Sequence, residues 1–191
     1  MGCDSPCPSP VRPLDQAVNT ISTKHYAQAF VRQKRLTDAA WLQRCDELAI
    51  EQRVLFMELL TFGRDGLNAS ATRALIDYLS VLQAIADTVA KHASVPVEMP
   101  EFQAAILRTG QFFHAADTDD RDHSARITKA WFKVVVDRRE PVVWNGCIET
   151  LQQHGILTSP LIKDAVVTLW AIADIYSRRF SEGPPHRVAA E

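Results

Sequence analysis

The side chains best suited to chemistry gather in residues 112–131, which read FFHAADTDDRDHSARITKAW. This stretch holds two histidines and four aspartates: His114, His123, Asp117, Asp119, Asp120 and Asp122. Imidazole nitrogens and carboxylate oxygens bind divalent metals, and both groups exchange protons as general acids or bases. One interpretation is therefore a small enzyme or enzyme subunit with a metal or acid/base site that takes a divalent cation. The residues of that site are His114, Asp117, Asp120 and His123.

Known metal-binding patterns fit this stretch poorly. A calcium loop requires glycine at its sixth position and glutamate at its twelfth, and counting from Asp117 those positions hold Asp122 and Thr128. A di-iron bundle requires Glu-x-x-His on two helices, and the stretch offers one Asp-x-x-His, from Asp120 to His123. Aspartates are also common in turns and before helices, where they accept backbone N–H bonds and complement the helix dipole. We favour this structural interpretation, so no cofactor is predicted.

Other catalytic patterns are missing from the sequence. It contains no Gly-x-Ser-x-Gly, no His-Glu-x-x-His and no glycine-rich loop that would cradle a phosphate. An enzyme is accordingly the less favoured class.

Cysteine usage and hydropathy indicate the compartment. Two cysteines lie in a Pro/Ser-rich beginning and two in segments with helical periodicity: Cys3, Cys7, Cys45 and Cys147. This distribution does not resemble a disulfide framework, which favours a reducing cytoplasm. We see no secretory leader and no apolar run of membrane-spanning length. We therefore expect a cytoplasmic protein without a membrane partner.

The charge balance argues against nucleic acid as a partner. The formal net charge is -2, which provides no attractive field for a polyanion. Basic clusters recur at residues 32–35, 137–139 and 177–179, but each is expected in the last turn of a helix, where cations offset the helix dipole. Nucleic-acid binding is retained only as a weaker third interpretation.

Hydrophobic periodicity predicts the elements that must position these side chains. Apolar residues recur at helical spacing through most of the chain, and prolines, glycines and capping residues divide it. The expected helices cover about 13–35, 38–62, 69–89, 100–116, 124–139, 141–153 and 160–180. Short strands at residues 134–136 and 141–144 are an alternative, but no hairpin signal joins them. The prediction is an all-α fold: one domain over residues 13–181, a bundle or irregular array of about seven helices, with disordered tails at 1–12 and 182–191.

Two expected helices are apolar over more than one stripe. The helix at 38–62 carries a second apolar row, Leu42, Ala49, Phe56 and Leu60, and the last helix is similarly apolar. A helix that is apolar on most sides is either central in the fold or in contact with a partner. The favoured function is therefore a helical interaction module, such as an adaptor, regulatory factor or accessory subunit, that binds a protein partner or self-associates.

Overall fold

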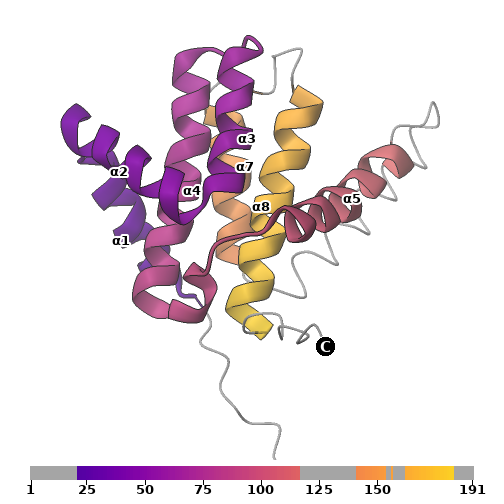
Figure 1. Cartoon of the computed structure of the whole chain (residues 1–191). Helices are drawn as coiled ribbons and strands as arrows, with labels where there is room; N and C mark the ends of the chain where they lie inside the picture. The colour runs from indigo at the N-terminus through magenta and orange to yellow at the C-terminus, as the bar shows by residue number, and fades with distance from the viewer. Residues whose placement is uncertain (1–20, 117–140, 154–155, 157–161, 183–191) are drawn as a thin grey trace, which may run out of the picture.

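The computed structural model describes residues 21–116, 141–153, 156 and 162–182, and the side chains of residues 112–116, 153, 162 and 182 also lie outside the described part. Seven α-helices and one short 3-10 helix make up this part of the chain (Figure 1). They are α1 (Thr23–Lys34), α2 (Asp38–Glu51), α3 (Arg53–Arg64), α4 (Ala69–Val89), η1 (Lys91–Ser94), α5 (Met99–Ala116), α7 (Pro141–Gln153) and α8 (Ile162–Glu182). No strand occurs among the described residues, including 141–144, and the all-α prediction is confirmed. The predicted domain limits and disordered tails stay predictions.

Polar side chains fix the helix starts. Thr37 Oγ1 accepts a hydrogen bond from the amide of Ala40, and Asn68 Oδ1 accepts one from Ala71, as expected of N-cap residues. Ser22 caps α1 in the same way and has an extended backbone, so the prediction of one helix from residue 13 to 35 is wrong at this point. Gly66 adopts a φ of 112°, the left-handed conformation that the turn after α3 requires.

Gln52 divides the helix predicted at 38–62 into α2 and α3. Its side chain is fully buried and donates to Gln83 Oε1 at 3.0 Å and to the carbonyls of Ser94 and Val95. Its own Oε1 accepts from the amide of Val97 at 2.9 Å. The backbone of Gln52 is non-helical, with φ -133° and ψ 49°, and these bonds tie the α2–α3 junction to the segment that precedes α5.

Helix α4 lies at the centre, with α1, α3 and α7 against it, while α5 packs mainly along α8 (Figure 1). Both α4 and α8 bury side chains on most of their circumference, among them Leu75, Leu79, Leu82, Leu169 and Ile172. The apolar character of the last helix therefore reflects central burial. Among the described helices, none combines the length and apolar character needed to cross a bilayer.

A polar stripe runs along the otherwise apolar α4. Asp77, Ser80 and Gln83 are all buried. Asp77 accepts from Gln33 Nε2 of α1 at 2.9 Å, and Ser80 donates to Gln33 Oε1 at 2.8 Å. Gln83 accepts from the Tyr176 hydroxyl of α8 at 2.7 Å. The stripe thus links α4 to both neighbouring layers through specific hydrogen bonds.

Arg179 fastens the beginning of α5 to α8. Its side chain is only 4% exposed and forms a bidentate pair with Glu101, at 3.0 Å and 2.6 Å. The same guanidinium donates to three backbone carbonyls of the connection before α5: those of Ala93, Val95 and Pro96. One buried cation therefore holds both the connection and the first turn of α5.

Candidate functional site

The predicted metal or acid/base site lies almost entirely outside the described residues. His114 belongs to α5, but its side chain is not described, and Asp117, Asp120 and His123 fall in the undescribed range 117–140. Within the described part, no group of three or more His, Cys, Asp or Glu side chains is placed to hold a metal. The site at residues 114–123 therefore stays a prediction from the sequence.

Neither described cysteine is prepared to act as a nucleophile. Cys147 is fully buried, and burial raises the pKa of its thiol far above the ordinary value. Cys45 is partly buried, and burial together with the negative charge of Asp77 raises its pKa to about 11. Because the thiolate is the reactive form, both side chains are inert thiols at neutral pH.

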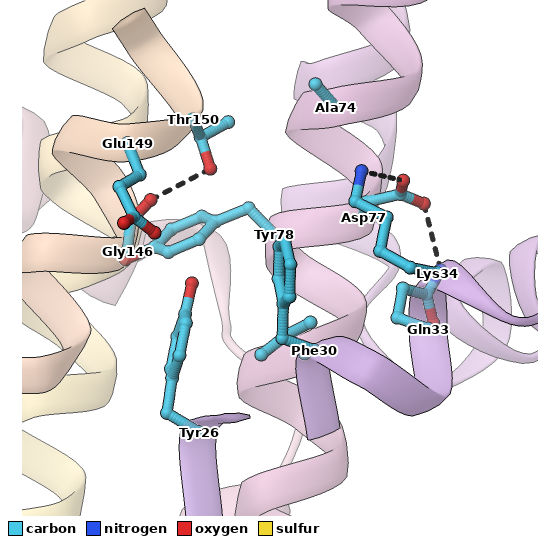
Figure 2. Close-up of a pocket in the computed structure, with 11 residues that line it drawn as sticks. Tyr26, Phe30, Gln33, Lys34, Ala74, Asp77, Tyr78, Gly146, Glu149 and Thr150 are labelled. Carbon is cyan, nitrogen blue, oxygen red and sulfur yellow. Dashed lines mark hydrogen bonds and ion pairs between the residues drawn. The ribbon is translucent and has the colours of Figure 1, made fainter. Parts of the chain in front are cut away.

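A small pocket lies where α1, α4 and α7 meet (Figure 2). Tyr26 of α1 points its hydroxyl at the backbone of α7 beside Gly146, and the ring of Tyr78 lies next to it. On the other side of the pocket, Asp77 accepts from Gln33 and forms an ion pair with Lys34 at 3.5 Å. The cavity volume of the pocket is about 10 Å³, enough for one water molecule.

The chemistry available in this pocket is limited. Burial, followed by the negative charge of Glu149, raises the pKa of Tyr26 well above its usual value, so the phenol keeps its proton at neutral pH. The Tyr78 hydroxyl is already used, because it donates to the carbonyl of Val143 at 3.0 Å. Asp77 has a further donor in the indole N–H of Trp41, at 2.8 Å. Tyr78 and Asp77 are thus already bound to other groups and Tyr26 stays protonated, so the pocket has the properties of interior packing rather than of a reaction site.

A much larger apolar groove opens between α3, α5 and α8. Its volume is about 1160 Å³. Its apolar lining comprises Phe62, Met99, Phe102, Ile106, Leu107 and Val167. Leu107 is 66% exposed and Met99 is 41% exposed, while Phe102 forms part of the buried floor. We name this surface the α3/α5/α8 groove.

Polar groups border the groove but do not converge in it. Among the described residues, three charged ones line it: Glu58 from α3, and Lys163 and Asp164 from the first turn of α8. These three carry both signs of charge and form no cluster of one sign that would orient an ionic substrate. The groove therefore has the properties of a contact surface: apolar in the middle and polar at its edges.

The sequence predicted some of the apolar residues of this groove but not that others are exposed to solvent. Phe102 and Ile106 are four residues apart in the helix predicted at 100–116, a spacing that puts them on one apolar stripe, and both line the groove. Leu107 follows Ile106 directly and lies off that stripe, which was the available signal for a second apolar face on α5. The second row predicted on the helix at 38–62 is split: Phe56 is buried, whereas Leu42 is exposed.

Two of the three basic clusters can be placed. Arg32 and Lys34 lie in the last turn of α1, and Arg179 lies in the last turn of α8, as expected. Residues 137–139 lie outside the described part of the chain.

The comparisons with known proteins add no relative. Protein-family models, curated proteins and solved structures were compared with the chain, and none of the three sets contained a match.

Proposed function

We propose that this protein is a helical protein-interaction module of the cytoplasm that binds an amphipathic helix of a partner protein in the α3/α5/α8 groove. The observation that carries the proposal is the exposed apolar wall formed by Met99 and Leu107 of α5 above the buried floor of Phe102. Apolar groups collected in a groove are a frequent mark of protein contact surfaces, and methionine suits surfaces that adapt to a partner.

The size of the groove favours a peptide segment over a small molecule. Pockets for small ligands usually measure about 300–1000 Å³ and bring a few polar groups together at fixed positions. The α3/α5/α8 groove exceeds that range, at about 1160 Å³, and its charged residues stand at the border. A ligand that presents a long apolar face matches it better.

A helix is the conformation that this surface can receive. The described part of the chain contains no strand edge to which an extended peptide could add. The walls are helices, and helix-in-groove recognition uses apolar side chains at positions i, i+3 or i+4, and i+7 of the ligand. The Arg179–Glu101 pair fixes the first turn of α5, so the wall bearing Met99 is held in place before a ligand binds.

Site-specific photocrosslinking tests the proposal. A photoreactive phenylalanine analogue replaces Leu107 in the full chain, expressed in its own host, and the crosslinked peptides are sequenced. We expect one partner segment with apolar residues at helical spacing. A synthetic peptide of that segment should bind the wild-type protein, measured by fluorescence anisotropy, and become helical on binding.

Two variants supply the matched comparison. Leu107→Glu places a charge on the wall of the groove and should weaken the peptide about tenfold or more, equivalent to about 1.4 kcal/mol or more. Ile50→Glu makes the same change at an 82% exposed residue of α2 that does not line the groove, and it should change affinity less than about twofold. Crosslinks that map only to this chain itself, or equal effects of the two variants, would refute the proposal.

The rival function is an enzyme or enzyme subunit with its site at residues 114–123. It predicts that His114→Ala combined with His123→Ala abolishes metal content or activity while the fold persists. Metal analysis of the purified protein before and after this double substitution distinguishes it from the interaction module, because the groove residues are untouched.

A further inference from the structure

A second groove lies on another face, between α1 and α4, with a volume of about 1040 Å³. Its floor is apolar and contains Ala29, Leu36, Ala84 and Val89. Three cations stand along α1 at this groove: Lys24, Arg32 and Arg35. No acidic residue of the described part of the chain lines it, although Glu47 and Asp87 line a smaller adjoining hollow that shares Arg32 with it. The surface, named here the α1/α4 groove, therefore combines an apolar floor with basic residues along α1.

The three cations have no ion-pair partner in the described part of the chain. Two other basic residues of the same helices form ion pairs: Lys34 of α1 pairs with Asp77, and Arg73 of α4 pairs with Asp38. Lys24, Arg32 and Arg35 line the same groove, so their charge is available to a ligand.

The helix dipole accounts for only part of this arrangement. Arg32 lies in the last turn of α1 and Arg35 is its C-cap residue, where cations are favourable. Lys24 is the second residue of the same helix, and the first turn contains no acid. A cation at that end opposes the dipole, so the dipole does not explain the position of Lys24.

The cations also lie on the outer face of α1. Lys24, Val31 and Arg35 are spaced by seven and four residues, so they share one side of the helix, and Val31 is 45% exposed between the two charges. At a rise of about 1.5 Å per residue, Lys24 stands about 12 Å from Arg32 and about 16 Å from Arg35 along the axis. A ligand helix beside α1 would meet them with acids about eight and eleven residues apart.

We propose that the α1/α4 groove is a second docking site, which binds an acidic amphipathic helix of a protein partner. Charge complementarity selects an acidic ligand, and the apolar floor of Ala29, Ala84 and Val89 selects one that also presents an apolar face. Nucleic acid fits less well, because the groove lining in the described part of the chain offers no Phe, Tyr or Trp and only the imidazole of His25 for base stacking, and a phosphate backbone gains nothing from an apolar floor. The site shares no lining residue with the α3/α5/α8 groove, so the proposal stands independently of the function proposed above.

A displayed library of 18-residue helical peptides, selected against the full-length protein, tests this proposal. Counter-selection uses the triple variant Lys24→Glu, Arg32→Glu and Arg35→Glu. Enriched peptides should carry acids at a spacing of about eight and eleven residues beside an apolar stripe. Fluorescence anisotropy then measures the binding of one enriched peptide, and of a scrambled peptide of identical composition, to each variant.

The triple variant should bind the enriched peptide at least about tenfold more weakly than the wild-type protein does. The wild-type protein should bind the scrambled peptide at least about tenfold more weakly than the enriched peptide. The control is Arg53→Glu with Arg64→Glu, which reverses two exposed cations of α3 away from this groove, a charge change of four against six in the triple variant. It should change affinity less than about threefold. Leu107→Glu should leave this binding unchanged, which separates failure of one groove from failure of the other.

Three outcomes would overturn the proposal: no enrichment, enriched peptides without acids, or equal affinity for the scrambled peptide. Tighter binding of a single-stranded oligonucleotide than of any peptide would assign the surface to nucleic acid instead. Circular dichroism of each variant verifies that the helices persist, so a loss of binding reports on the surface and not on unfolding.

Discussion

Replacement of Arg179 by methionine is the most informative perturbation of this fold. The arginine side chain is 4% exposed, and its partner Glu101 is 26% exposed. The guanidinium also serves three backbone carbonyls in the connection before α5. Methionine retains much of the unbranched stem and its apolar packing, so the substitution mainly removes the charge and its donors.

The expected loss follows from these contacts. Removing one member of a buried ion pair costs about 3–5 kcal/mol, since the other charge stays behind without compensation. The Glu101 carboxylate retains some access to water, which places the effect at the lower end. Carbonyls left without donors add about 1 kcal/mol each where water cannot reach them. We expect Arg179→Met to lower the free energy of unfolding by about 3–6 kcal/mol, and the melting temperature by roughly 10–15 °C.

Urea unfolding, followed by tryptophan fluorescence and circular dichroism, measures this change. The neighbouring Arg178 provides the control, because its side chain is 41% exposed and pairs with Asp174 four residues earlier. Asp174 also binds Arg108 at 2.6 Å, so Arg178→Met leaves no carboxylate unpaired. That variant should lose less than about 0.5 kcal/mol.

A double-mutant cycle tests the cause. Glu101→Gln combined with Arg179→Met should cost about 1–3 kcal/mol less than the sum of the two single substitutions, because the two side chains act as one unit. The reasoning is refuted if Arg179→Met and Arg178→Met have similar effects, or if the Glu101 and Arg179 substitutions are additive. A changed urea dependence would show instead that the unfolded or native ensemble was altered.

Three further predictions concern the interior. Gly146→Ala places a Cβ 1.9 Å from the Tyr26 hydroxyl oxygen and should destabilise the protein by about 1–3 kcal/mol. The Cβ of Gly110→Ala, in α5, meets nothing within 4 Å, so this variant should be more stable by about 0.5–1 kcal/mol. Thermal unfolding compares the two variants, and changes in stability of the same sign would contradict the geometry. Gln52→Leu removes the donors and acceptor at the α2–α3 junction and should lower the free energy of unfolding by about 2–4 kcal/mol, measured by urea unfolding. A decrease of less than about 1 kcal/mol would contradict this prediction. Burial raises the pKa of Cys147 above the ordinary value of 9.0, so the folded state keeps a proton that the unfolded state releases, and stability should fall as pH rises above about 9. The slope should be shallower in Cys147→Ala by up to about 1.4 kcal/mol per pH unit; parallel slopes in urea unfolding between about pH 8 and pH 10.5 would exclude this contribution.

Local signals in the sequence predicted the starts of the helices at residues 38 and 69, but not the start of α1 after Ser22. Thr37 and Asn68 each cap a helix through one hydrogen bond to a residue three positions later, and such short-range chemistry is legible in a linear sequence. The break at Gln52 was not predictable in this way. Its cause is a set of partners 31 to 45 residues away, and the apolar spacing from Leu48 to Leu55 runs through it without interruption.

The grooves lie beyond local signals for a related reason. Ile106 and Leu107 are adjacent and chemically alike, yet Ile106 packs against the core while Leu107 is largely exposed. Which of them faces water depends on how α5 is set against α8. The charged border of the α1/α4 groove was visible as the cluster at residues 32–35, but its connection with Lys24 depends on the rotation of α1 on α4.

The polar stripe of α4 determines how α1 and α8 are positioned against α4. A purely apolar interface tolerates displacement of a helix by one turn, because one leucine replaces another at similar cost. Asp77 and Ser80 must both reach Gln33, and Gln83 must reach Tyr176; a displaced α1 or α8 would leave buried polar atoms unpaired, at about 1–3 kcal/mol for each. Helix α1 is one wall of the α1/α4 groove and α8 is one wall of the α3/α5/α8 groove. The same three side chains of α4 therefore hold one wall of each groove in the position that gives both surfaces their shape.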